Sequence, residues 1–86
     1  MRVLRLSRKA YKFLDTLPPK QLRQLHSKIN ALCDNCKPND CKKLKGYKNL
    51  YRVDSGEYRV VYKFDETVIY IDVIGKRNDG EIYQNL

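Results

Sequence analysis

The sequence predicts an α+β fold in the order strand, helix, helix, strand, strand, strand, with both helices packed on one face of a small, mostly antiparallel four-stranded sheet. Two observations predict it. Apolar residues between positions 8 and 33 recur every three or four residues, which is the helical period, whereas the chain after position 50 is rich in valine, isoleucine and tyrosine. Because 86 residues have room for one hydrophobic core, we expect residues 1–86 to form a single domain.

The first half of the chain is expected to contain one strand and both helices. Residues 2–6 have an alternating pattern, with Val3 between two arginines and with Leu4 and Leu6 on one side, which indicates a short strand. Ser7 is a suitable N-cap for the first helix. Pro18–Pro19 ends that helix and can begin the next, which continues to about Cys33, because proline suits the first helical position. The apolar faces of the helices comprise Ala10, Phe13, Leu14 and Leu17, and then Leu22, Leu25, Ile29 and Leu32.

Three strands are expected after the helices, separated by two-residue turns at Ser55–Gly56 and Asp65–Glu66. The predicted strands span residues 50–54, 57–64 and 67–75. These turns fix a register in which one face of the last two strands is uniformly apolar, so we expect the helices to cover that face. The cross-strand pairs predicted there are Tyr62–Ile69, Val60–Ile71 and Tyr58–Val73.

The same register predicts a charged cluster on the opposite face of the sheet. It places Arg52 directly across from Arg59, and Arg59 across from Asp72. Two arginines that face each other repel, so a bound anion between them is favoured over a purely structural ion pair with Asp72. The residues predicted on this face are Arg52, Asp54, Glu57, Arg59, Val61, Tyr70 and Asp72.

The net charge of +8 is the strongest feature of the composition. On so small a surface it produces a positive field that favours anionic partners. Nucleic acid is the commonest such partner, with acidic proteins and anionic lipid as competitors. A group of lysines is interleaved with tyrosines, so that ammonium groups can meet phosphates while rings stack on unpaired bases. These lysines are Lys42, Lys43, Lys45 and Lys48.

Two features of the sequence indicate a cytoplasmic protein without a membrane partner. No apolar run is long enough to span a membrane or to act as a signal peptide. The three cysteines lie within nine residues, and an odd number without a secretion signal argues against a disulfide framework. Zinc bound by Cys33, Cys36 and Cys41, with His26 or Asp40 as a fourth ligand, is an alternative, but free thiols are favoured because the Cys-x-x-Cys pair stands alone.

Three stretches of the C-terminal half resemble the RelE/ParE toxin superfamily. They are Lys43-Leu44-Lys45-Gly46 with Leu50-Tyr51-Arg52-Val53, then Gly56-Glu57-Tyr58-Arg59-Val60-Val61-Tyr62, and finally Gly75-Lys76-Arg77 followed by Glu81-Ile82-Tyr83. The order of the expected elements resembles this superfamily over the whole chain. The central strand is shared with ParE-type gyrase poisons, whereas a tyrosine six residues after the last arginine resembles the RelE branch of mRNA interferases.

The resemblance implies a ribosome-dependent endoribonuclease that cleaves mRNA in the ribosomal A site and needs no metal or other cofactor. In the RelE branch a ribose 2′-hydroxyl attacks the adjacent phosphate, leaving a 2′,3′-cyclic phosphate and a 5′-hydroxyl. Such a toxin inhibits translation and arrests growth until it is bound by its antitoxin. The expected antitoxin is acidic overall and RelB-like, and it would cover the basic face.

The resemblance also implies roles for individual residues. Arg59 resembles the strand arginine that stabilises the phosphate, and Arg77 resembles the C-terminal arginine at the leaving group. Tyr83 resembles the tyrosine that stacks on or orients the nucleotide, and Arg52 stands where the family has a lysine. The residues predicted to bind RNA or the ribosome are Lys42, Lys43, Lys45, Lys48 and Lys76.

Asp54 is the main departure from the family pattern, because it stands where the family has the lysine proposed as general base. Asp54 itself is favoured as the base here, although a carboxyl with a pKa of about 4 is a weak one. In the alternative, the site is impaired or Lys45 or Lys48 substitutes. Two further functions stay open, namely a ParE-like toxin that inhibits DNA gyrase by binding, and an RNA-binding homologue that has lost activity.

Overall fold

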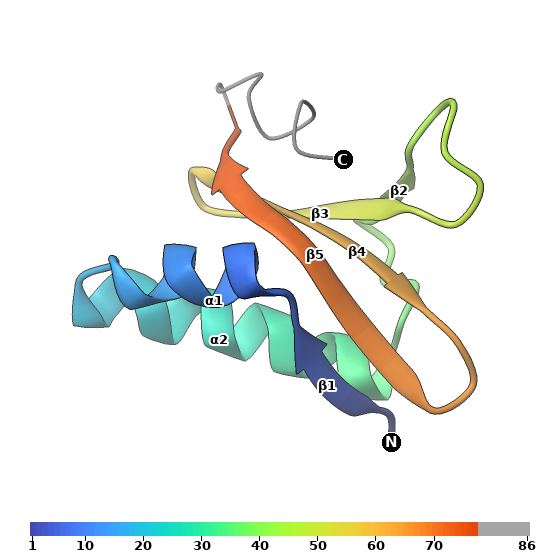
Figure 1. Ribbon diagram of the computed structural model, residues 1–86, viewed down its shortest axis with the longest axis horizontal. Coiled ribbons are helices and arrows are strands. Elements are labelled where there is room, and N and C mark those ends of the chain that lie inside the picture. The colour runs from blue at the N-terminus through green and yellow to red at the C-terminus, as the bar shows by residue number, and fades with distance from the viewer. Residues whose placement is uncertain (78–86) are drawn as a thin grey trace.

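The computed structural model describes residues 1–77, which form a layer of two helices and a five-stranded sheet (Figure 1). The helices are α1 (Arg8–Asp15) and α2 (Pro19–Asp34), and the strands are β1 (Val3–Leu6), β2 (Lys42–Lys43), β3 (Tyr51–Ser55), β4 (Tyr58–Phe64) and β5 (Val68–Lys76). The strand order is β1-β5-β4-β3-β2, in which β1 runs parallel to β5 and the other neighbours are antiparallel. The predicted α+β fold is confirmed, with one correction: the short strand β2 adds a fifth strand to the described sheet.

Helix α1 begins where the sequence predicts because Ser7 caps it. The Ser7 hydroxyl oxygen accepts a hydrogen bond from the backbone N–H of Ala10 at 3.0 Å. The same hydroxyl donates to the backbone carbonyl of Asp72 in β5 at 2.6 Å, which ties the start of the helix to the sheet. Pro19 is the first residue of α2, as its fixed φ favours. Within residues 1–77, neither helix is both long and apolar enough to cross a membrane.

The main hydrophobic core lies between the helices and the sheet. Tyr62 is the largest fully buried side chain, and its hydroxyl donates to the backbone carbonyl of Cys36 at 2.7 Å. That bond satisfies a polar atom that burial would otherwise penalise. The other fully buried members include Leu25, Ile29 and Leu32 of α2 and Val53, Val60, Ile69 and Ile71 of the sheet. Each large apolar side chain buried in this way contributes about 1.5–3 kcal/mol to folding.

The β3–β4 hairpin turns one residue later than predicted. Its two turn residues are Gly56 and Glu57, not Ser55 and Gly56. Gly56 has a φ of +60°, a left-handed conformation that favours glycine at the first position of a tight hairpin turn. Placing the glycine first in the turn therefore moves the register of the whole hairpin.

This register overturns the predicted arginine pair. Arg52 faces Val61, and Arg59 faces Asp54 on one side and Gly75 on the other, so the expected Arg52–Arg59 and Arg59–Asp72 pairs are wrong. The shift between β3 and β4 is two residues, and side chains alternate with a period of two. The predicted arginine and carboxylate side chains of β3 and β4 consequently keep their expected face, but with different neighbours.

A bulge between β4 and β5 overturns the second predicted register. Val61 pairs with Val73, whereas the next residue, Tyr62, pairs with Ile71, which leaves Asp72 as an extra residue in β5. The expected pairs Tyr62–Ile69, Val60–Ile71 and Tyr58–Val73 are therefore wrong. The observed pairs are Tyr62–Ile71, Val60–Ile74 and Tyr58–Lys76.

Val73 changes face because of this bulge. It was expected under the helices, but it packs with Leu44, Leu50 and Val61 in a second, smaller core. This cluster lies on the side of the sheet that the helices do not cover, which we call the helix-free face. The segment between β2 and β3 therefore covers the middle of the helix-free face and leaves its two ends accessible.

The loop between β4 and β5 is longer than the predicted two-residue Asp65–Glu66 turn. Phe64 pairs with Ile69, and the loop is closed by the side chain of Asp65. Its Oδ1 accepts hydrogen bonds from the backbone N–H groups of Thr67 and Val68, both at 2.8 Å. This carboxylate substitutes for a backbone turn, as aspartate commonly does.

Candidate functional site

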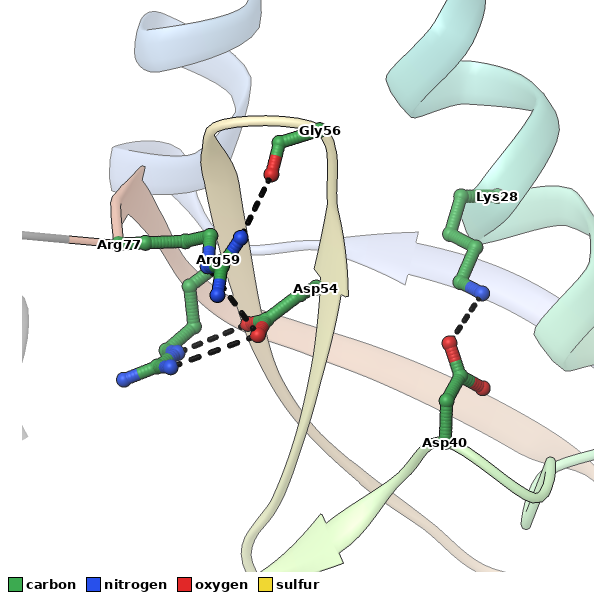
Figure 2. Close-up of polar contacts among 6 residues, drawn as sticks. All are labelled: Lys28, Asp40, Asp54, Gly56, Arg59 and Arg77. Atoms are coloured by element: carbon green, nitrogen blue, oxygen red, sulfur yellow. Dashed lines mark hydrogen bonds and ion pairs between the residues drawn. The ribbon is translucent and has the colours of Figure 1, made fainter.

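Two arginines meet one carboxylate at the end of the helix-free face near the β3–β4 turn (Figure 2). Arg59 Nε lies 2.9 Å from Asp54 Oδ1, and Arg59 Nη2 lies 3.4 Å from Asp54 Oδ2. Arg77 Nε lies 3.4 Å from the same Oδ2. We call Asp54, Arg59 and Arg77 the arginine site. The structure thus brings together three of the residues that the sequence predicts for catalysis.

Strands β3 and β4 and the residue that follows β5 position these side chains. Asp54 and Arg59 are direct cross-strand partners in β3 and β4 because the turn occupies Gly56 and Glu57. Arg77 directly follows β5 and is held by the backbone of that turn. Its N–H donates to the Glu57 carbonyl at 2.8 Å, and its Nη1 donates to the Gly56 carbonyl at 3.4 Å. Sequence patterns gave no indication of these two carbonyl contacts, since they depend on the exact turn.

The electrostatics of the site follow from this geometry. The hydrogen bond from Arg59 lowers the pKa of Asp54 below its ordinary value, and the charges of Arg59, Arg77 and Arg52 lower the pKa further against the opposing effect of burial. Asp54 is therefore a carboxylate at neutral pH. The Arg59 side chain is only 16% exposed, whereas that of Arg77 is 51% exposed. One guanidinium is thus fixed against the protein, and the other is open to a ligand.

Of the other two predicted catalytic residues, the structure describes Arg52 alone. Arg52 is half-buried and adjoins Val61 and Lys42 in the neighbouring strands; its charge acts on Asp54. Arg52 therefore adds positive potential beside the arginine site. Tyr83 lies outside the described residues, so its predicted place beside the nucleotide stays a prediction.

The lysines predicted to bind RNA are exposed, and they are not all on the same side of the sheet. Lys42 faces Arg52 across β2 and β3, on the helix-free face. Lys45 and Lys48 lie in the loop that follows β2. Lys76 pairs with Tyr58, a residue of the main core, so alternation puts it on the opposite face from Arg59. The described structure therefore does not group Lys76 with the arginine site.

The alternative zinc site finds no support in the geometry of residues 1–77, where no three histidine, cysteine or acidic side chains lie close enough to hold a metal ion. Cys33 is buried, which raises the pKa of its thiol, and Cys36 and Cys41 are half-buried free thiols. Both suggested fourth ligands have other partners: the ring of His26 contacts the amide of Asn30 at 3.2 Å, and Asp40 pairs with Lys28 at 2.6 Å (Figure 2).

Comparison with known proteins agrees with this fold. The family described as the ParE toxin of the type II toxin–antitoxin system parDE matches residues 4–80. A protein of Methanocaldococcus jannaschii assigned as toxin RelE1 is 34% identical over 85 residues, which cover 93% of this chain and 92% of that protein.

Two solved structures have closely similar folds. The RelE–RelB complex from Pyrococcus horikoshii superposes with a TM-score of 0.79 at 27% identity, covering 92% of this chain and 98% of that one. A mutant of the E. coli toxin RelE in the free state superposes with a TM-score of 0.81 at 23% identity, covering 98% and 92% of the two chains. The fold and the matches define a small toxin of a toxin–antitoxin system. The chain belongs to the RelE/ParE toxin superfamily, in its RelE-type branch.

Proposed function

We propose that this toxin is an endoribonuclease that cleaves mRNA in the ribosomal A site without a metal ion and so inhibits translation. One observation carries the proposal: Arg59 and Arg77 bring nitrogen atoms within 3.4 Å of the two oxygens of one carboxylate. Two guanidinium groups that can converge on one anion can also converge on a phosphate, whose oxygens suit the planar fork of arginine. Membership of the RelE-type branch supports the same chemistry.

Cleavage by the neighbouring ribose forms a bond from the 2′-oxygen to phosphorus and breaks the bond from phosphorus to the 5′-oxygen. The phosphorane gathers negative charge, which fixed cations stabilise by about 3–4 kcal/mol each. Arg59, the more buried arginine, would bind the phosphorane oxygens, and the more exposed Arg77 would stabilise or protonate the leaving 5′-oxygen. Arg52 would add positive charge, and Tyr83 would stack on the nucleotide.

Asp54 has two proposed roles in this reaction. As a general base it would accept the 2′ proton, but the lowered pKa of its carboxyl makes it a weaker base than an ordinary aspartate. As a positioning residue it would hold Arg59 and Arg77 in place before RNA binds, which its ion pairs to both arginines support. We favour the positioning role, in which a water molecule accepts the 2′ proton, and a pH profile described below separates the two roles.

The test of activity is primer extension on mRNA that is being translated, with the wild-type toxin and Arg77→Ala. We expect breaks at codon-defined positions with the wild type and their loss with the variant. If the wild type leaves the translated message intact, the proposed activity is wrong. Growth arrest that persists in both Arg59→Ala and Arg77→Ala would also contradict it.

Two partners follow from the proposal. The ribosome would present the mRNA, and a RelB-like antitoxin would hold the toxin inactive. The similar structure from Pyrococcus horikoshii is a RelE–RelB complex, which supports an antitoxin for this chain as well. Because the toxin carries a net charge of +8, we expect its antitoxin to be acidic overall and to cover Arg59 and Arg77.

A second candidate function is inhibition of DNA gyrase by binding. It is favoured by one observation, the match of residues 4–80 to the family described as ParE toxin. A supercoiling assay with purified gyrase distinguishes the two functions. Loss of supercoiling, together with intact translated mRNA, would establish the gyrase inhibitor.

A further inference from the structure

The other end of the helix-free face carries a row of three side chains from three neighbouring strands. Tyr70 of β5 is the direct partner of Arg5 in β1 and of Lys63 in β4. Partners in adjacent strands point to the same side of the sheet. Leu4 and Leu6 pack against the main core, so their side chains lie on the helix side of the sheet. Arg5 lies between them in the strand and therefore points to the helix-free face. The row therefore consists of a tyrosine between two cations.

The tyrosine in this row is accessible. Tyr70 is 38% exposed, and the Lys63 ammonium lies 5.7 Å from the centre of its ring. Arg5 and Lys63 are themselves exposed. A ring that is surrounded by cations and still open to solvent can accept a flat, negatively charged ligand with little rearrangement, because the lysine stem is flexible.

A hollow of about 750 Å³ adjoins the row where β1, β5 and β4 meet. Arg5, Lys63 and Tyr70 line it, together with Ser7 and Asp72. The Ser7 hydroxyl is already bonded to the backbone carbonyl of Asp72, so it serves the helix cap. Among the described residues that line the hollow, the Asp72 carboxylate is the single acidic group, against two cations, so this lining attracts an anion.

Strand β4 connects this hollow with the arginine site. Arg59, Val61 and Lys63 alternate on the same side of β4, and four residues of extended strand separate Arg59 from Lys63 by roughly 13 Å. The second, smaller core of Leu44, Leu50, Val61 and Val73 lies between the two ends. That core is buried beneath the segment between β2 and β3, so a single-stranded RNA only a few nucleotides long can span this distance by crossing that segment, which carries exposed lysines.

We propose that the Arg5–Tyr70–Lys63 hollow is a second nucleotide subsite for the RNA. One unpaired base stacks on Tyr70, and its phosphate binds Arg5 and Lys63. This inference rests on the proposed function, since it adds a binding position to the same substrate. An aromatic ring between two cations matches an unpaired base and its phosphate, whereas an acidic peptide would need the cations alone.

The proposal is tested by the binding of a fluorescein-labelled single-stranded RNA in which every ribose carries a 2′-O-methyl group, so that cleavage is blocked. Fluorescence anisotropy measures the dissociation constant for wild type, Tyr70→Ala and Tyr70→Phe. We expect Tyr70→Ala to weaken binding roughly 5- to 100-fold, because a stacked base is lost. Tyr70→Phe keeps the ring and should stay close to wild type.

Two comparisons make this test specific. Tyr11→Ala is the matched control, because Tyr11 is a 62% exposed tyrosine on α1, in the helix layer on the other side of the sheet. It should not change the affinity. Lys63→Ala should weaken binding and lower the slope of log affinity against log salt by about 0.7, as one phosphate contact on a single strand does.

The outcomes separate this subsite from the proposed activity. Unchanged RNA affinity in Tyr70→Ala overturns the subsite, and Arg77-dependent breaks in translated mRNA would still support the activity. If the wild type neither binds this RNA nor cleaves translated mRNA, both proposals fail. If Tyr70→Ala loses affinity for the antitoxin but not for RNA, the hollow is a protein-docking surface and the subsite is wrong.

Discussion

The arginine site and the lysine segment, residues 42–48, are both strongly basic, but their charges are held in opposite ways. Arg59 and Arg77 share the carboxylate of Asp54, and Arg77 also bonds the turn backbone. The lysines at 42, 43, 45 and 48 are all exposed. One region fixes a few cations within hydrogen-bonding distance of one anion, whereas the other displays its cations to solvent.

Cations that are fixed and cations that are exposed suit two different electrostatic functions. Stabilising a transition state requires charges that are already in place when charge develops, because moving them during the reaction costs free energy. Attracting a polyanion depends mainly on the number of positive charges near its phosphates and is weakened by salt. We therefore expect the arginine site to determine the rate of cleavage and the lysine segment to determine affinity.

The largest effect is expected from Arg59→Ala. Removing the more buried guanidinium deletes a fixed cation, so the rate of mRNA cleavage at saturating toxin should fall by about 100- to 1,000-fold. The rate is measured on ribosomes programmed with a synthetic mRNA, as the appearance of cleaved message. Lys48→Ala is the matched single-charge control and should leave the saturating rate near wild type. Equal losses of rate in both variants would abolish the distinction between the two regions.

Asp54→Asn is expected to have the next largest effect. Its amide cannot hold two guanidinium groups as a carboxylate does, so the saturating rate should fall roughly 10- to 100-fold while ribosome binding is retained. Unchanged cleavage would remove Asp54 from the mechanism. Asp65→Asn is the matched control: Asp65 is also a carboxylate with a lowered pKa, but it accepts its hydrogen bonds from the backbone N–H groups of Thr67 and Val68 and from the Thr67 hydroxyl. It should leave cleavage unchanged.

The pH dependence of the Asp54→Asn variant separates a base from a positioning residue. Between pH 6 and 8 the carboxylate is fully ionised, because its pKa lies below the ordinary aspartate value of about 4. If Asp54 is the base, the variant must rely on hydroxide, and its rate should rise about tenfold per pH unit relative to wild type. If Asp54 positions the arginines, the two profiles should run parallel. We expect parallel profiles.

The elements of the fold were predictable because each depends on local chemistry. Ser7 caps α1 as expected, proline begins α2, and the helical apolar stripes Leu25, Ile29 and Leu32 are buried. The register was not predictable, because Ser55–Gly56 and Gly56–Glu57 are both reasonable turns. A turn with glycine second needs a positive φ at both turn residues, whereas one with glycine first needs it at the glycine alone, and Gly56 is the residue of the turn that has it. The bulge at Asp72 could not be predicted either, because the residues on both sides of it, Ile71 and Val73, are apolar and fit either face of the sheet.

Asp54 and Arg59 kept their predicted face of the sheet despite these errors, for a physical reason. The slip between β3 and β4 is two residues, which preserves the face of Asp54 and Arg59 but changes the partner of Arg59 from an arginine to a carboxylate. Arg59 therefore forms an ion pair with Asp54 in place of the predicted repulsion from Arg52. The row of Arg5, Tyr70 and Lys63 was missed, because residues so far apart in sequence meet only once the strand order is known.

The lysine segment should show a smaller effect that appears in affinity rather than in rate. The double variant Lys45→Ala/Lys48→Ala removes two exposed charges without disturbing the buried Leu44 and Leu50 beside them. Binding of the non-cleavable RNA should weaken, and the slope of log affinity against log salt should fall by about 0.7 for each lysine that contacts a phosphate. The cleavage rate at saturating toxin should stay near wild type. An affinity that is unchanged at low salt would exclude this segment from the RNA interface.

The smallest expected effect is on the free energy of unfolding, and it comes from the ion pairs of Asp54 with Arg59 and Arg77. Because the folded-state pKa of Asp54 is lowered by Arg59 and Arg77, its ionised form stabilises the folded protein above the unfolded pKa of about 4, and this contribution is lost as the pH falls through the folded pKa. The pair is partly exposed, so water screens it and the contribution should be below about 1 kcal/mol.

Urea unfolding of wild type and Asp54→Asn at pH 7, 5 and 3 measures this contribution as a difference in the free energy of unfolding. The difference should be present at pH 7 and 5 and should shrink toward pH 3, where the carboxyl of the wild type becomes protonated. A difference that does not change with pH would mean that the ion pairs add no stability, and that Asp54 and the arginines are held together by the turn backbone alone. In that case the cations of the arginine site, like those of the lysine segment, would gain no stability from a partner carboxylate.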